Sequence, residues 1–173
     1  CYPFSKDGES IEQDFEQRLL NVIDYTLGIE LPLLRGIEIG KVRQLRALLV
    51  VLSNEVPMLV DISKLSKLTA LSRNTLLSYL QHLHDSGLVR LLYSEDTSVK
   101  KMQKPDKILI GDTNLMYALS LAEPNTGTLR EAFFCNQMSA VGKRIEYSKT
   151  KGDYLIDGKY AFEIGGAQKD GRQ

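Results

Sequence analysis

The stretch from Asp61 to Gly87, "DISKLSKLTALSRNTLLSYLQHLHDSG", constrains the possible folds more than any other part of the 173-residue chain. Asp61 is suited to cap a short helix, and Ser72, after a three-residue break, is suited to cap a longer one. Leucines spaced three and four residues apart predict that each helix buries one face. The residues expected to face inward are Ile62, Leu65 and Leu68 in the short helix and Leu76, Leu77, Leu80 and Leu83 in the longer one. This pattern predicts a helix-turn-helix.

The segments around this stretch extend the pattern to a winged helix. A helix from about Lys41 to Ser53 precedes it, and two strand-like runs, "LVRLLY" and "KILIG", follow it on either side of a polar loop. Gly87 is placed to end the longer helix in a left-handed conformation. We therefore predict a winged helix-turn-helix domain over residues 37–111. Residues 1–36 are predicted to be a helical linker, with an amphipathic helix that ends at Gly28 and a connector after it.

The last third of the chain has a different character. Two helical segments, "DTNLMYALSLAEP" and "TGTLREAFFCNQMSAVG", are followed by three short strand-like runs, "RIEYSK", "DYLID" and "KYAFEI". The last two runs flank Asp157-Gly158, a strong signal for a two-residue hairpin turn. We predict a partial α/β domain over residues 112–173, which makes the whole chain α+β.

Composition and charge exclude several classes of protein. The formal net charge is zero, so only a local patch can bind a polyanion. Residues 35–110 hold twelve Lys and Arg against seven Asp and Glu, so the patch is expected there. Two cysteines cannot build a disulfide framework, which favours a reducing cytoplasm. No apolar run reaches the roughly 18 residues needed to span a bilayer, so no membrane partner is expected.

The predicted helix-turn-helix offers a candidate surface for double-stranded DNA. In such units the second helix turns polar side chains toward base edges, and basic residues on the wing bind phosphates. The candidates are Arg73, Asn74, Ser78 and Gln81 on the helix, and Arg90, Lys100, Lys101, Lys104 and Lys107 on the wing. His82 is expected to face solvent and His84 to be half-buried, pointing elsewhere, so they form no metal pair. Because only one arginine lies on the helix face, docking on a protein is the alternative interpretation.

Three acids in the last third form a second candidate site. Glu131 lies on a predicted helix, and Asp153 and Glu163 lie on successive strands. Nucleases that use two metal ions bring such acids together to hold Mg²⁺, and they place a lysine two residues after the last acid. Here that position is Gly165. Three interpretations stay open: structural roles for the acids, a remnant site that binds metal or nucleic acid weakly, with Asp153 and Glu163 as the metal candidates, or an active Mg²⁺-dependent nuclease.

The chain resembles the C-terminal half of a large bacterial and archaeal family of AAA-type ATPases. The resemblance rests on "CYPF" at the start, "SRNTLLSYLQHLHDSGLVRLLY", "PDKILIGDTNLMYAL", "GTLREAFFCNQM" and "GDYLIDGKYAFEIGG". In these proteins a nucleotide-binding module precedes a winged helix and a C-terminal domain of unknown function, similar to restriction-endonuclease-like folds. The resemblance implies that "CYPF" is the end of the ATPase module and that this chain is a piece of a longer protein.

The resemblance also implies what this part of the protein does and lacks. No glycine-rich phosphate loop with Lys and Ser or Thr occurs in the chain, so ATP and Mg²⁺ are expected to bind in the upstream module. Glu131, Asp153 and Glu163 occupy the nuclease-like positions, but "GGAQKD" replaces the basic residue that usually follows. We therefore expect a non-catalytic region whose partners are DNA and the upstream ATPase module. An unfinished sheet edge also predicts self-association.

Overall fold

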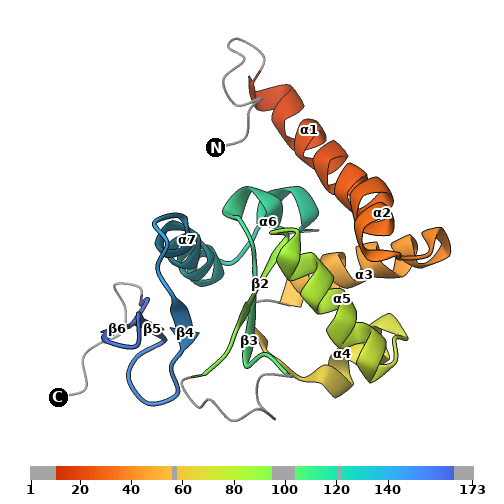
Figure 1. The fold of residues 1–173 in the computed structure, drawn as a ribbon. Coiled ribbons are helices and arrows are strands. Elements are labelled where there is room, and N and C mark those ends of the chain that lie inside the picture. The colour runs from red at the N-terminus through yellow and green to blue at the C-terminus, as the bar shows by residue number, and fades with distance from the viewer. Residues whose placement is uncertain (1–10, 56–57, 95–103, 121, 166–173) are drawn as a thin grey trace.

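A computed structural model describes residues 11–55, 58–94, 104–120 and 122–165 of the chain. The fold is mixed helix and sheet, as the sequence predicts, and the described residues form two small three-stranded sheets (Figure 1). None of the helices in these ranges is both long enough and apolar enough to cross a bilayer.

The N-terminal helical segment is longer than predicted. Helix α1 (Ile11–Tyr25) runs into a π-helical turn, η2 (Thr26–Glu30), and then into α2 (Leu31–Arg35). The predicted end at Gly28 is therefore wrong, and the predicted connector is helical. Pro32 lies in the first turn of α2, directly after the π-helical turn. The segment ends at Gly36, whose φ of 64° is the left-handed conformation that glycine favours.

The winged helix has the predicted order of elements, with one extra strand. Helix α3 (Ile39–Glu55) is followed by β1 (Met58–Leu59), α4 (Ile62–Thr69), α5 (Arg73–Asp85), β2 (Val89–Leu92) and β3 (Lys107–Ile110). Strand β3 lies in the middle of an antiparallel sheet between β1 and β2. Ile62 and Leu65 are buried as predicted, but Leu68 is half exposed, so that part of the prediction is wrong.

The turn after α5 packs tightly against the end of β3. Gly87 adopts a φ of 77°, and the Leu88 N–H donates back to the Leu83 carbonyl, which closes the helix as predicted. Gly111 donates its N–H to the Leu88 carbonyl. A Cβ on Gly111 would lie 1.9 Å from the Gly87 carbonyl oxygen, so only glycine fits at this crossing.

The C-terminal part consists of two helices and a meander. Helices α6 (Thr113–Leu119) and α7 (Thr126–Ala140) are followed by β4 (Ile145–Tyr147), β5 (Tyr154–Ile156) and β6 (Tyr160–Phe162). The strands pair antiparallel in the order β4-β5-β6, and the Asp157-Gly158 turn joins the last two, as predicted. Both turn residues have positive φ, 55° and 68°, as a type I′ turn requires.

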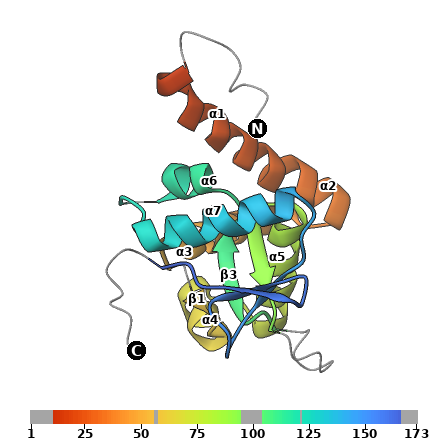
Figure 2. The same cartoon turned by 90° about the vertical axis from the view of Figure 1, so that its left-hand side faces the viewer.

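The sheet of the winged helix separates two hydrophobic cores. On one face, Val89, Leu91, Ile108 and Ile110 pack into the larger core with α1, α3, α4, α5 and α6. On the other face, Leu92 and Leu109 pack with Cys135 and Tyr154 from α7 and β5. Figure 2 shows α7 and the C-terminal sheet lying in front of β3. Helix α6 packs in the larger core together with the winged helix, although the sequence prediction assigns it to the C-terminal domain that begins at residue 112.

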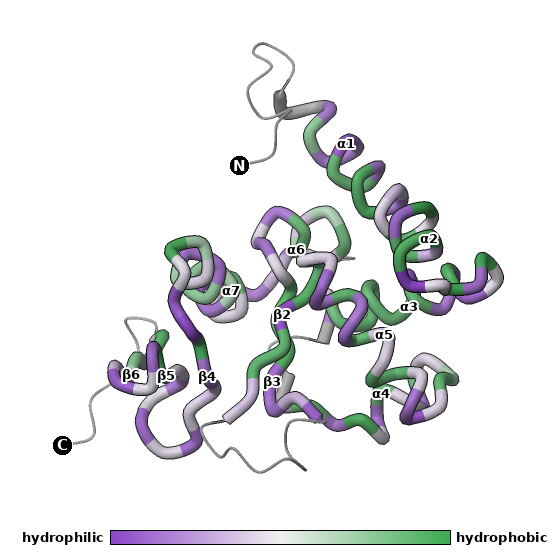
Figure 3. Tube along the Cα trace, in the orientation of Figure 1, coloured by the Kyte–Doolittle hydropathy of each residue, from purple (hydrophilic) through white to green (hydrophobic). Residues whose placement is uncertain are grey.

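The segment from α1 to the start of α3 exposes large apolar side chains. They are Val22, Tyr25, Ile29, Leu33, Leu34 and Ile39, and the last three are 77–82% exposed. Four of them recur along the segment at spacings of three and four residues, so they form one line beside the buried face. Figure 3 shows apolar residues along this whole segment. We call these six residues the apolar stripe.

Candidate functional site

Helix α5 has the two faces that the sequence predicts. Leu76, Leu80 and Leu83 are fully buried, and Leu77 is half-buried. Tyr79 is also buried, which the leucine pattern alone did not indicate. The four candidate side chains on the other face are exposed: Arg73, Asn74, Ser78 and Gln81. The predicted ridge and the predicted polar surface are therefore both present.

Caps fix where α4 and α5 begin. The Asp61 carboxylate accepts from the Ser63 and Lys64 N–H groups at 2.9 and 3.0 Å, and the Ser72 hydroxyl accepts from the Thr75 N–H at 3.2 Å. The Lys64 backbone bond holds the pKa of Asp61 below its ordinary value, and the charges of Lys104 and Lys67 act in the same direction. Lys104, at the base of the wing, therefore lies near the start of α4.

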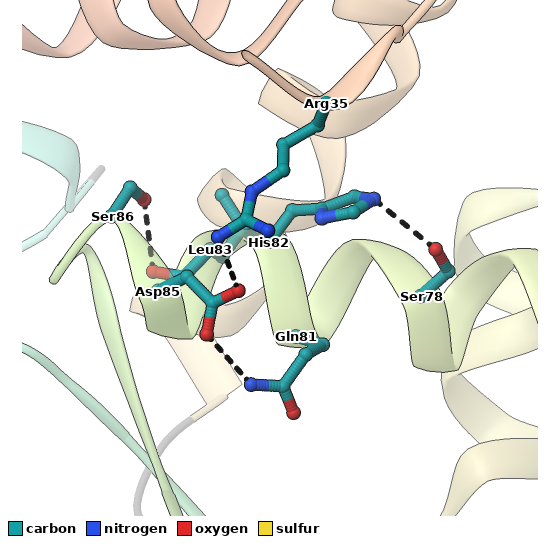
Figure 4. A network of polar contacts seen from close by, with 7 residues as sticks. All are labelled: Arg35, Ser78, Gln81, His82, Leu83, Asp85 and Ser86. Atoms are coloured by element: carbon teal, nitrogen blue, oxygen red, sulfur yellow. Dashed lines mark hydrogen bonds and ion pairs between the residues drawn. The ribbon is translucent and has the colours of Figure 1, made fainter.

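A polar network runs along the exposed face of α5 and ties it to α2 (Figure 4). The Gln81 amide donates to one Asp85 oxygen at 2.8 Å, and Arg35 contacts the other oxygen at 2.8 Å. The Ser78 hydroxyl lies 3.2 Å from Nε2 of His82. Two of the four candidate side chains are thus held in position by neighbours one turn away.

The network also changes the prediction for His82. Its ring is half-buried rather than facing solvent, and within the described residues Nδ1 has no hydrogen-bond partner. Burial lowers the pKa of His82 below its ordinary value, and the nearby Arg35 charge lowers it further, while Asp85 opposes this. His84 is half-buried as predicted, with Nδ1 3.3 Å from the Val89 carbonyl oxygen.

A groove of about 390 Å³ lies between α5 and the wing. One wall is α5, and the other is formed by the end of β2 and the residues that lead into β3. The lining residues are Asn74, Leu77, Leu80, Gln81, Leu91, Tyr93 and Pro105. Two of the candidate polar residues therefore border a partly apolar hollow, which the sequence did not reveal.

Two of the predicted phosphate ligands do not lie on the outer surface of the wing. Arg90 and Lys107 project from the sheet face that packs on α7 and β5, where they alternate with Leu92 and Leu109 across the two strands. Arg90 is half-buried, and desolvation lowers its pKa. Lys104 is exposed as predicted. Lys100 and Lys101 lie outside the described residues.

Glu131 on α7 lies at the contact between the winged helix and the C-terminal unit, which consists of α7 and the sheet β4-β5-β6. We call this contact the joint. The Glu131 carboxylate forms a short ion pair with Lys107 and accepts from the Tyr154 hydroxyl at 2.6 Å. The Lys107 side chain is 9% exposed and the Glu131 side chain 16%. The Lys107 ammonium also lies 4.8 Å from the Tyr154 ring centroid, within cation–π distance. This arrangement gives the predicted nuclease-like acid a structural partner.

The other two acids lie apart from Glu131. Asp153 accepts from the Ile164 N–H at 2.7 Å and so fixes the chain after β6, while Glu163 is exposed. Within the described ranges, no three His, Cys, Asp or Glu side chains gather in a way that could hold a metal ion. The structure therefore does not bring the three predicted acids together.

Cys135 lies next to this joint and is fully buried. Desolvation raises the pKa of its thiol to about 12, so the thiol is protonated at neutral pH and is a poor nucleophile. Desolvation likewise raises the pKa of Tyr154, which keeps its hydroxyl a donor to Glu131. No local pattern in the sequence indicated this cluster, because its members come from β3, α7 and β5.

One family model, described as "Domain of unknown function (DUF8612)", matches residues 1–126 of the chain. The matched span includes α1 to α6, with the whole winged helix, and stops at the start of α7. Glu131, Asp153 and Glu163 all lie beyond it. No curated protein and no solved structure matches the chain.

Proposed function

From the premise that the chain belongs to the family described as Domain of unknown function (DUF8612), we propose that its winged helix binds double-stranded DNA. In this proposal the chain is the non-catalytic C-terminal region of a cytoplasmic AAA-type ATPase, as the sequence resemblance implies. ATP and Mg²⁺ belong to the upstream module. The family description itself assigns no activity, so the proposal rests on the winged helix.

The observation that carries the proposal is the division of α5 into a buried leucine ridge and an exposed polar face. Arg73 and Asn74 lie in its first turn, where a recognition helix contacts base edges. Two further exposed cations, Lys67 on α4 and Lys104 at the wing, lie near Asp61 at the start of α4. In the part of the chain that the structure describes, neither Arg73 nor Lys104 has an ion-pair partner. We propose both as phosphate contacts.

Fluorescence anisotropy with a labelled duplex at low salt tests the proposal. We expect micromolar affinity that falls steeply with salt, because counterions are released when phosphates are neutralised. Arg73→Ala and Lys104→Ala should each weaken binding and reduce the salt slope by about one.

Arg130→Ala is the matched control for this experiment. It removes one positive charge from an exposed position on α7, outside the winged helix, so it changes the net charge equally. Duplex affinity should stay at the wild-type value. If the wild-type chain does not bind at tens of micromolar, or if Arg130→Ala weakens binding as much as Arg73→Ala, the DNA proposal fails.

The apolar stripe favours a second candidate function, that of a protein-interaction module. Contiguous exposed apolar surface on a globular domain marks a contact with another protein more often than chance exposure does. The stripe lies on α1, η2, α2 and the start of α3, mostly within the N-terminal segment that the resemblance places directly after the ATPase module. We propose that module as its partner.

Co-purification of the chain with the separately expressed upstream module tests this second function. The double variant Leu33→Glu, Leu34→Glu should abolish co-purification. Both side chains are over three-quarters exposed in the chain alone. In the complex, the substitutions would remove apolar contact area and bury two unpaired charges. Lys104→Glu, on the winged helix, should have no effect. The opposite pattern would place the contact on the winged helix instead.

A further inference from the structure

We propose that the groove between α5 and the wing binds an unpaired nucleobase, so that the chain holds single-stranded or locally opened nucleic acid. The inference rests on the proposed nucleic-acid function and deepens it, because Asn74 and Gln81 belong to both surfaces. Duplex reading uses the outward edge of α5, whereas the base would enter the hollow beside it.

The size and lining of the groove suit a planar heterocycle. A volume of about 390 Å³ lies within the usual range of small-ligand sites, about 300–1,000 Å³. Leu77, Leu80, Leu91 and Pro105 provide apolar surface, and Tyr93 adds an aromatic ring to the lining. Aromatic rings bind unpaired bases by stacking, and this attraction tolerates every base because each has a π face.

Two amides provide the polar groups that a base edge needs. In the part of the chain that is described, the Asn74 amide has no hydrogen-bond partner, so both its donor and its acceptor are available. The Gln81 amide nitrogen is held by Asp85, which leaves its carbonyl oxygen to accept from a base. Asn74 and Gln81 are two helical turns apart on α5, so they border the groove at two points along its length.

Each wall of the groove includes one residue that directly follows an exposed cation in the sequence. Arg73 precedes Asn74 on the α5 wall, and Lys104 precedes Pro105 on the wing wall. Both cations are exposed, so a phosphate on either side of the bound base would meet a positive charge. A peptide with apolar side chains would gain nothing from this pair of charges. Charge complementarity therefore favours a nucleotide chain over a protein segment as the occupant.

The experiment compares single-stranded and duplex oligonucleotides of the same sequence by anisotropy, with three forms of the chain. The wild type should bind both. Tyr93→Leu should weaken single-strand binding about tenfold, because one base–aromatic stack is lost, and should leave duplex binding unchanged. Tyr93→Phe keeps the ring and should retain wild-type affinity for both. Circular dichroism and thermal melting of each variant establish that it is folded.

Each outcome decides between the two proposals. If the wild type binds duplex but no single strand, the base site is refuted while the DNA function stands. The groove would then be a site for a side chain of a partner protein. If the single strand alone is bound, the base site stands and duplex reading fails. Equal affinity of folded Tyr93→Leu and wild type for the single strand refutes the base site, and so does an equal loss toward both oligonucleotides.

Discussion

At the scale of single residues, the pair of Lys107 and Glu131 joins the winged helix to the C-terminal unit. A buried charge is tolerated only when it is paired and hydrogen-bonded, and here one carboxylate serves both the ammonium and the Tyr154 hydroxyl. The net contribution of such a pair is small compared with the cost of breaking it. Its role is best measured by removing one partner.

We predict that Glu131→Gln lowers the free energy of unfolding by about 3 kcal/mol, because it leaves the Lys107 charge buried without a counterion. Urea unfolding at pH 7, followed by circular dichroism, measures the change. Adding Lys107→Met should recover part of the loss. The control, Glu123→Gln, alters an exposed acid and should change stability by less than about 0.5 kcal/mol. Equal stability of Glu131→Gln and wild type would contradict the proposed role of the pair.

The lowered pKa of His82 predicts how the free energy of unfolding changes with pH. The pKa of His82 in the folded protein is below the ordinary value of 6.5, which the unfolded chain retains. The unfolded state therefore binds more protons as pH falls through this value, and stability present above about pH 6.5 is lost below it. Asp61, Asp106 and Asp157 have lowered pKa values and titrate below 3.8, so they do not contribute in this range.

We predict that the wild type loses stability between about pH 7.5 and about pH 5.5, and that His82→Gln loses less over the same range. Urea unfolding of both proteins at the two pH values gives the difference. An identical pH dependence of the two proteins would show that His82 is not responsible.

At the scale of elements, the caps and the leucine spacing of α4 and α5 were predictable because both signals are local. The extension from Gly28 to Arg35 was not, because glycine and proline usually end helices, and here packing of Leu27 and Leu31 into the core favours the helical segment. The inward-facing Arg90 and Lys107 were missed for a different reason. A strand buried on both faces shows no alternation that distinguishes its sides, and the partners on α7 and β5 are distant in sequence.

Two glycines of the N-terminal segment give opposite predictions. Gly28 has a helical conformation, and no atom lies within 4 Å of the point that a Cβ would occupy, so Gly28→Ala should stabilise the protein by about 0.5–1 kcal/mol. Gly36 has a φ of 64°, and Gly36→Ala should destabilise it by about 1 kcal/mol. Thermal or urea unfolding of both variants measures the two effects. If Gly28→Ala were the more damaging, the continuous helix would be wrong.

At the scale of the whole molecule, each face of the winged-helix sheet packs in a different hydrophobic core. Leu109 on β3 is fully buried on the side of α7 and β5, while Ile108 beside it is buried on the opposite side. Neither core is complete without the sheet, so the two units are expected to unfold together.

We predict that Leu109→Ala lowers the free energy of unfolding by about 2–5 kcal/mol and keeps a single transition. Far-ultraviolet circular dichroism reports the helices. Because the chain has no tryptophan, a tryptophan introduced as Phe134→Trp reports the second core, against which Phe134 packs; the two curves should coincide. Leu33→Ala, 79% exposed, is the control and should change stability by less than about 0.5 kcal/mol. Separate transitions for the two probes would show independent units.

The alternation of cations and leucines on β2 and β3 leaves this hairpin only one way to pair. A slip of one residue inverts the strand that slips. If β2 slipped, Arg90 would face the aliphatic side and Val89 and Leu91 would leave it; if β3 slipped, Lys107 would face that side and Ile108 and Ile110 would leave it. Both sides would then lose their partners at once. The long connection between β2 and β3 is therefore free to vary in length and sequence without loosening the alignment of the strands that it joins.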